Sequence, residues 1–310
     1  MREMSNTMQL VMAAFCAVSL SSCEYEFDIM DKDAEPELFV ECFAGSNDST
    51  VIKAGVALPL NMPFEDIDIN ALELDMKVNG KSIGLELKYK EYGGLPYPYW
   101  FSGQQYSPGD KVEIKAEYPG IGSVSTDARI PLRLPSGSVF MDKEDEELET
   151  YINISGIPEE CRYLGLKVIQ ELSFINEEGE LLSSSREMLV ESSESFYNKV
   201  SLEQISKNFI FWDCNDTGNN NIRLKLYNNV YIKLEYVSVR YKVIFYNLSE
   251  ELYRYYKAVA VSANGAWNMD GWTLYRSMYS YSNIDGGFGI LGGMTVAQTD
   301  WFASETETEF

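Results

Sequence analysis

The cysteine that follows the N-terminal apolar run offers the clearest chemistry in the chain. Leu20-Ser21-Ser22-Cys23 closes the apolar segment LVMAAFCAVSL. A leucine three residues before a cysteine, with two small residues between them, is typical of a bacterial lipobox. There the cysteine Sγ takes a diacylglycerol, cleavage frees the amine, and a third acyl chain usually follows; two or more chains anchor a protein stably. We therefore predict lipidation at Cys23, with an ordinary signal peptide and an incidental cysteine as the alternative.

The residues on either side of Cys23 have the layout of an exported, tethered chain. Arg2, a short apolar middle and a small-residue exit indicate that residues 1–22 are a cleaved signal. The apolar run is shorter than the roughly 20 residues that a membrane-spanning helix needs. Residues 23–36 form an acidic tether, which is either a plain solvated spacer or a sorting signal. Such acidic residues look like the signal that sends Bacteroidetes lipoproteins to the outer face of the outer membrane, so we expect a lipid-anchored, surface-exposed location there.

Histidine is absent from the whole chain, and this excludes most familiar catalytic sites. Ser-His-Asp and Cys-His catalysis and the usual zinc sites all need its imidazole. Carboxylate pairs could still hydrolyse glycosides, but no pair stands out by spacing among 48 Asp and Glu residues. The net charge of −23 argues against nucleic acid and anionic lipid as partners. We expect a non-enzymatic protein with no catalytic residues, no metal and no cofactor.

Three further cysteines remain in the mature chain. None belongs to a CxxC motif. Cys42 lies in the apolar run LFVECF and is expected to be a small buried hydrophobe. Cys161 and Cys214 could form a disulfide in an exported protein, which would stabilise the fold by ~3–4 kcal/mol.

Aromatic residues gather in two places where they could recognise a ligand. EYGGLPYPYWFSGQQY (91–106) contains Tyr97, Tyr99 and Trp100 between prolines and glycines. Aromatic rings on a rigid loop offer a large contact area at a small entropic cost. The alternative is that these rings cover the open end of a β-sandwich. The same two interpretations apply to Trp267 and Trp272.

Short runs of alternating apolar and polar residues predict a mainly β fold. Residues 71–90 alternate in this way, and Asn79-Gly80 between the two halves favours a tight hairpin turn. The alternation resumes at Ile83, Leu85 and Leu87. Repeated Pro-Gly turns further along strengthen the pattern, which is typical of an immunoglobulin-like β-sandwich.

A stretch rich in Pro, Gly and Ser divides the chain into two predicted domains. The boundary lies in residues 131–138, so the immunoglobulin-like domain covers residues 37–135. Residues 136–310 form a second antiparallel β domain with one helix packed on it. In this domain we expect residues 141–151 to be an acidic loop or a short exposed turn of helix.

The second domain contains a predicted hairpin and a predicted helix. Residues 161–185 read as a long hairpin that turns at 177–179, and residues 221–249 as two more strands. Ser249 then has the features of an N-cap for a helix over 249–263, whose apolar residues recur at helical spacing.

The glycine-rich segment YSNIDGGFGILGG (281–293) is interpreted as a packing motif. A phosphate-binding loop would need a following helix and, in the P-loop, a Gly-Lys-Ser/Thr end, which the segment lacks. Glycines instead let the backbone pass close under the helix. The apolar residues between them are expected in the core: Ile284, Phe288, Ile290 and Leu291.

These features together resemble the DUF4249 family of Bacteroidetes lipoproteins. The resemblance rests on the lipobox, on EPELFVECF (35–43), and most specifically on the helix and the glycine-rich segment 281–293. It implies an exported lipoprotein of unknown activity and an accessory role beside a TonB-dependent outer-membrane transporter, either capturing a ligand or docking. The alternative is a structural or adhesive surface lipoprotein that binds glycan or matrix. Residues 264–280 depart from the family's usual pattern.

Overall fold

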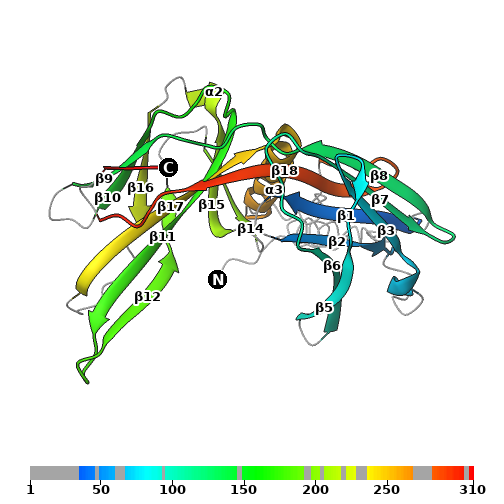
Figure 1. The fold of residues 1–310 in the computed structure, drawn as a ribbon, viewed down its shortest axis with the longest axis horizontal. Coiled ribbons are helices and arrows are strands. Elements are labelled where there is room, and N and C mark those ends of the chain that lie inside the picture. Colours follow the sequence, from blue (N-terminus) through cyan, green and yellow to red (C-terminus); the bar gives the residue numbers. More distant parts are fainter. Residues whose placement is uncertain are drawn as a thin grey trace, which may run out of the picture. The chain divides into compact units, whose positions relative to one another are not determined.

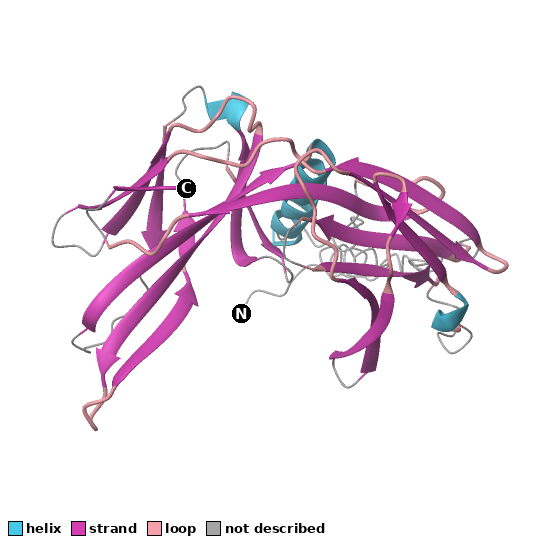
Figure 2. Cartoon of the chain, viewed as in Figure 1, coloured by secondary structure: helices cyan, strands magenta, loops and turns pink. Residues whose placement is uncertain are grey.

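The computed structural model describes residues 35–45, 49–59, 67–92, 95–144, 149–191, 197–202, 206–217, 221–227, 236–267, 281–303 and 307–310. Most of them lie in strands, and helix α3 (Glu250–Trp267) is the one long helix among them (Figure 1; Figure 2). Segments 36–57 and 65–310 form one compact unit, to which every named element belongs. The predicted mainly β class, with antiparallel sheets and a C-terminal helix, is therefore confirmed. No helix in the described ranges has the length and apolar character needed to cross a bilayer.

The largest sheet has ten strands and draws them from both halves of the chain. Along the sheet the strands follow the order β14 (Asn198–Leu202), β15 (Ser206–Asp213), β11 (Tyr163–Ile175), β17 (Tyr236–Leu248), β18 (Phe288–Gln298), β1 (Glu37–Ala44), β2 (Thr50–Ala57), β6 (Leu95–Ser102) and β5 (Glu86–Tyr92). Beside this path, β12 (Leu181–Glu187) pairs with β11.

Two smaller sheets accompany the large one. The first contains, in order, β4 (Lys81–Ser82), β3 (Glu73–Val78), β7 (Lys111–Tyr118) and β8 (Gly122–Arg129). The second contains β13 (Leu189–Glu191), β16 (Ile222–Tyr227), β10 (Glu149–Ser155), β9 (Ser138–Glu144) and β19 (Glu307–Glu309). Two short helical turns, η2 (Ile69–Ala71) and α2 (Cys214–Thr217), lie in connections.

The first small sheet packs against β1 and β18 to form a β-sandwich. The alternation in β3 buries Met76 completely while its charged neighbours face water. Asn79 and Gly80 have φ values of 51° and 77°, as the predicted tight hairpin turn requires. The strands of these two sheets bury β-branched side chains: Val40, Ile52, Val112, Ile114 and Val124.

Strand β18 connects the two halves of the chain within the large sheet. Its first residues pair in parallel with β1, in the register Phe39↔Phe288 to Ala44↔Gly293. Its last residues pair antiparallel with β17. A Cβ at Gly292 would lie 2.6 Å from Cβ of Leu252 in α3, and Ile290 and Leu291 are fully buried. The packing interpretation of the glycine-rich segment is therefore confirmed for Ile284, Ile290 and Leu291, whereas Phe288 is only half-buried. β18 also carries the C-terminal chain across the predicted boundary at 135/136.

Strand β15 is buried on both faces over most of its length, which explains its continuous apolar run Phe209–Trp212. Phe209 and Phe211 point to one face of the large sheet, towards α3, and Ile210 and Trp212 point to the other. The face that carries Ile210 and Trp212 packs against the five-stranded sheet. The core that the two sheets share contains Met141, Ile152, Leu164, Leu166, Leu224, Val243 and Phe245.

Helix α3 covers the other face of this region. Its buried side chains pack into an aromatic cluster with Phe43, Phe209, Phe211 and Tyr246. Ser249 caps the helix, since its Oγ accepts from the backbone N–H of Leu252 at 3.3 Å. The helix predicted over 249–263 is thus confirmed, and it continues to Trp267.

Two local expectations are corrected. After β4 the chain does not continue the hairpin with β3, because β5 crosses to the large sheet and pairs with β6, with Leu87 opposite the buried Trp100. Residues 141–151 are neither a loop nor a helix where they are described. They belong to β9 and β10, which pair with each other and bury Met141 and Ile152 on one face.

Candidate functional site

The candidate recognition surface lies on the hairpin formed by β5 and β6. β5 is the last strand of the large sheet, and the hairpin extends from its end (Figure 1). In antiparallel strands, directly opposed residues project to the same side. The register pairs Lys88 with Tyr99, Lys90 with Tyr97, and Glu86 with Phe101.

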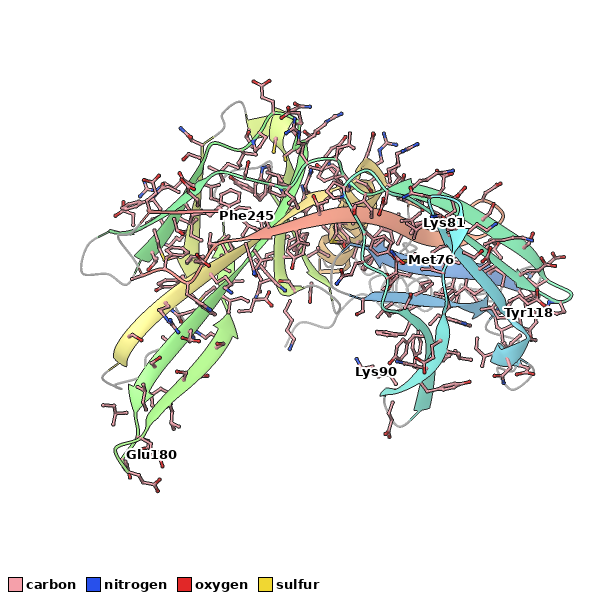
Figure 3. The ribbon with its side chains drawn as sticks, viewed as in Figure 1. Met76, Lys81, Lys90, Tyr118, Glu180 and Phe245 are labelled. Carbon is pink, nitrogen blue, oxygen red and sulfur yellow. The ribbon has the colours of Figure 1, made fainter. Side chains whose placement is uncertain are left out.

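This register produces a row of aromatic rings with cations beside it, which we call the aromatic face. It consists of Tyr97, Tyr99, Phe101, Lys88 and Lys90. Lys88 lies with its Nζ 3.9 Å from the centroid of the Phe101 ring, which is cation–π geometry, and also 3.0 Å from Glu86. Figure 3 labels Lys90 at this hairpin. Of these five residues the sequence analysis had indicated Tyr97 and Tyr99, and the strand alternation is the signal that adds Phe101 and the lysines.

The aromatic side chains differ in their access to solvent. Tyr97 is 40% exposed, whereas Trp100 is only 6% exposed because it points to the opposite side of β6 and packs inside. The predicted exposed loop is therefore a strand pair, and Trp100 does not belong to the aromatic face. On the side of Trp100, but further out along the hairpin, Tyr89 is 52% exposed opposite Pro98.

The aromatic face has the chemistry of a stacking surface. Tyrosine rings provide flat apolar contact with a hydroxyl at the end, and lysines add donors that suit carboxylates and hydroxyls. A sugar ring or an extended polar peptide could lie along the row. A two-stranded hairpin also holds these side chains at fixed spacing, which lowers the entropic cost of binding.

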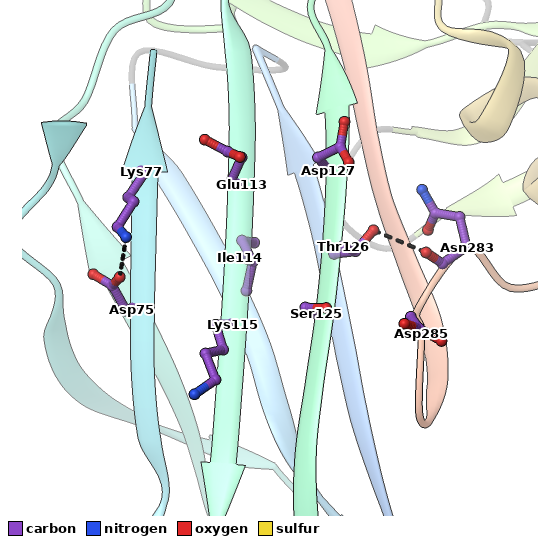
Figure 4. A pocket seen from close by; sticks show the side chains of 10 residues that line it. All are labelled: Asp75, Lys77, Glu113, Ile114, Lys115, Ser125, Thr126, Asp127, Asn283 and Asp285. Atoms are coloured by element: carbon purple, nitrogen blue, oxygen red, sulfur yellow. Dashed lines mark hydrogen bonds and ion pairs between the residues drawn. The ribbon is translucent and has the colours of Figure 1, made fainter. Parts of the chain in front are cut away.

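A second surface feature is a polar hollow on the outer side of the four-stranded sheet (Figure 4). It has a volume of about 470 Å³ and is lined by side chains from β3, β7 and β8 and from the segment before β18. Several of its charged side chains form ion pairs: Lys77 lies 3.5 Å from Asp75, and Glu113 lies 2.8 Å from Lys111, which is outside the lining. Within the described ranges no group of Asp, Glu or Cys is arranged to hold a metal ion. We regard the hollow as a solvated sheet face.

The contacts beside the hollow attach the segment before β18 to the four-stranded sheet. Asp285 and Ser125 exchange two backbone hydrogen bonds, of 2.9 and 3.1 Å. Thr126 Oγ1 donates to the backbone oxygen of Asn283 at 2.9 Å. The chain before β18 therefore covers the edge of β8.

The remaining predicted site residues are distributed as follows. Cys23 and Trp272 lie outside the described residues, and the same holds for the side chain of Trp267. Cys161 and Cys214 are free thiols in the structure, so the candidate disulfide is not formed there. Burial raises the pKa of Cys161 to about 11 and that of Cys214 to about 12.

Cys42 fits its predicted role. It is 1% exposed in β1, and burial raises the pKa of its thiol well above the usual range. The side chain behaves as a small core hydrophobe.

The fold and this surface define a mainly β protein that presents hairpins from a large shared sheet. The chain belongs to the family described as a domain of unknown function, DUF4249, whose model matches residues 23–300. The match begins at Cys23, the predicted lipidation site. No curated protein matches the chain.

Proposed function

We propose that this protein is a non-enzymatic lipoprotein of the bacterial outer membrane, anchored through Cys23. Like the surface lipoproteins of Bacteroidetes, it would be exposed on the outer face of that membrane. The observation that carries the proposal is the sequence Leu20-Ser21-Ser22-Cys23, with the family match beginning at that cysteine. The acidic tether after it agrees with a surface location. Several acyl chains on one residue would hold the folded β unit at the bilayer.

The anchored protein would act as an accessory of a TonB-dependent transporter, capturing a ligand or docking on the transporter. The family resemblance suggests this role. The aromatic face supports ligand capture, because its tyrosines and lysines lie side by side on one hairpin and are partly open to solvent. The ligand class that suits it is a glycan or an extended polar peptide.

The anchor is tested with Cys23→Ala. Wild-type protein should incorporate labelled palmitate and sediment with outer membranes, and the variant should do neither. Protease treatment of intact cells should remove the wild-type protein if it faces outward. Membrane fractionation that is unchanged in Cys23→Ala would remove the basis of the proposal.

The partner is tested by purifying tagged full-length protein from detergent-solubilised outer membranes. We expect a TonB-dependent transporter to co-purify in a stoichiometric amount. Recovery of the tagged protein without any transporter would contradict the accessory role while leaving the anchor intact.

The aromatic face also favours a second candidate, an adhesive lipoprotein that binds glycan or matrix. The variant Tyr97→Ala/Tyr99→Ala separates the two candidates, with Ser123→Ala as an exposed control on another sheet. An adhesin should lose cell-surface binding while nutrient uptake is unaffected. Trp100→Ala is unsuitable here, because removing a buried tryptophan costs about 3–5 kcal/mol of stability.

A further inference from the structure

The hairpin of β11 and β12 ends in an apolar tip that its strand pattern does not explain. Ile175 is 55% exposed, Leu181 is 64% exposed and Leu182 is 41% exposed. These residues flank the turn 176–180. Figure 3 labels Glu180 at the far end of the hairpin.

The tip is apolar on both faces of the ribbon. Ile175 is directly opposite Leu181 on one face, and Phe174 is directly opposite Leu182 on the other. The shaft below it is polar, since exposed serines follow in β12 and the hydroxyls of Ser173 and Ser183 share a hydrogen bond of 3.0 Å. A ribbon in water would have the reverse distribution, with its polar residues at the exposed end.

The hairpin is held rigidly at both ends. At its base the buried Gln170 accepts from Arg186 Nε at 2.8 Å and donates to the Tyr241 hydroxyl at 3.2 Å. At the turn, Asn176 Oδ1 accepts from the backbone N–H of Glu180 at 2.8 Å. A preorganised tip loses little conformational entropy when it docks.

The negative charge of the turn indicates which kind of partner the tip can bind. The turn carries Glu177, Glu178 and Glu180 and has no Lys or Arg. A lipid surface is disfavoured, because inserting the apolar residues would bring these carboxylates to anionic headgroups. A second copy is disfavoured as well, because each chain carries a net charge of −23 and would present the same acidic turn.

We propose that this tip, residues 174–182, is a docking element that inserts into an apolar cleft bordered by Lys and Arg on the partner transporter. Being apolar on both faces, it suits a cleft with two walls better than a flat surface. The acidic turn would pair with the basic rim and orient the contact. This inference rests on the proposed function and adds the surface by which the protein binds.

The test uses full-length tagged protein purified from its own outer membranes. The variant Ile175→Ser/Leu181→Ser removes the exposed apolar groups from one face of the tip. Leu132→Ser/Leu134→Ser is the matched control, because those leucines are 78% and 51% exposed elsewhere. We expect the tip variant to recover at least tenfold less transporter and the control to recover wild-type amounts, with unchanged melting temperatures for both.

Charge is tested with Glu177→Gln/Glu178→Gln, which keeps Glu180 and its contact with Asn176. At low salt we expect this variant to recover less transporter than the wild type does. Added salt should reduce the amount of recovered transporter less in the variant than in the wild type, because fewer charges are screened. Recovery and salt dependence equal to wild type would contradict the role of the acidic turn in docking.

A photo-crosslinking amino acid at Leu181, with Ser184 as the shaft control, identifies what the tip touches. A crosslink to the transporter at position 181 supports the inference, whereas crosslinks to lipid or to a second copy overturn it. If the Ile175→Ser/Leu181→Ser variant recovers as much transporter as the wild type does, the inference is also overturned, but the proposed function is not affected. If wild-type protein recovers no transporter, both this inference and the accessory role are contradicted, and only the proposed lipid anchor is unaffected.

Discussion

At the scale of single residues, the close packing of β18 against β1 depends on individual glycines. Gly289 in β18 has φ +117°, and a Cβ added there would overlap the carbonyl oxygen of Val40 in the neighbouring strand. Gly84, in contrast, has open space where its Cβ would be. The two glycines look alike in the sequence and differ only in what surrounds them.

We expect Gly289→Ala to lower the free energy of unfolding by about 3 kcal/mol, through backbone strain and the clash with β1. Gly84→Ala should change it by less than about 1 kcal/mol, because no contact is disturbed. Urea denaturation followed by tryptophan fluorescence measures both. Equal stabilities for the two variants would contradict the packing role of Gly289.

The buried thiols make the stability depend on pH in the alkaline range. The folded pKa of Cys161 is about 11 and that of Cys214 about 12, above the usual value of 9.0, because burial disfavours the thiolate. Below pH 9 both thiols are protonated in the folded and unfolded states, so they have no effect there. Above pH 9 the unfolded chain loses these protons first, and stability falls until the folded pKa values are passed.

We therefore expect the free energy of unfolding to fall above pH 9, by up to about 1.4 kcal/mol per pH unit for each thiol. Denaturation curves collected from pH 8 to pH 11 measure this slope. The variant Cys161→Ala/Cys214→Ala should have a shallower slope, whatever its stability at pH 8. An identical slope in the variant would show that other groups cause the alkaline loss.

At the scale of elements, α3 and β18 stabilise each other through one serine. Ser249 Oγ accepts from the N–H of Leu252 in the first turn of the helix and from the N–H of Gly293 in β18, each at 3.3 Å. The backbone N–H of Ser249 donates to Gly293 O at 2.8 Å. The helix cap is thus also a contact between helix and sheet.

We expect Ser249→Ala to cost about 2 kcal/mol, because it removes the cap and leaves a second buried N–H without its acceptor. Thermal unfolding and urea denaturation measure the effect. Ser125→Ala, at an exposed serine of β8, is the control and should stay within about 0.5 kcal/mol of wild type. A Ser249→Ala effect of that small size would rule out the double role.

At the scale of the whole molecule, the two halves of the chain share one sheet. β1 has β2 on one side and the C-terminal strand β18 on the other. Between the halves, the carbonyl oxygen of Arg133 accepts from Asn247 Nδ2 and Thr295 Oγ1, both at 2.8 Å. The predicted linker is therefore held against strands of the second half.

We expect a fragment of residues 23–135 to lack a cooperative unfolding transition. β1 would lose its partner β18, and the edge of β8 would lose its bridge to Asp285. The full mature chain should unfold in one transition. Urea denaturation followed by far-UV circular dichroism compares the two, and a fragment with the midpoint of the full chain would contradict the shared sheet.

Much of the local structure could be predicted from neighbouring residues. Asn79-Gly80 marked a turn, Ser249 marked a helix start, and the hairpin 161–185 was found with its turn. The aromatic face could be predicted only in part, because Tyr97 and Trp100 lie close in sequence yet face opposite sides of β6. Which side is buried depends on the sheet that β5 joins, and no neighbouring residue specifies it.

The sequence by itself determined the β class, the turns, the helix cap and the candidate lipidation site, because each depends on residues a few positions apart. Only the tertiary structure decided that β18 pairs in parallel with β1, that β5 leaves β3 for β6, and that the tip of the β11–β12 hairpin stays exposed. Strands of similar pattern can pair in many ways, and the choice among them depends on the apolar area that the whole chain buries.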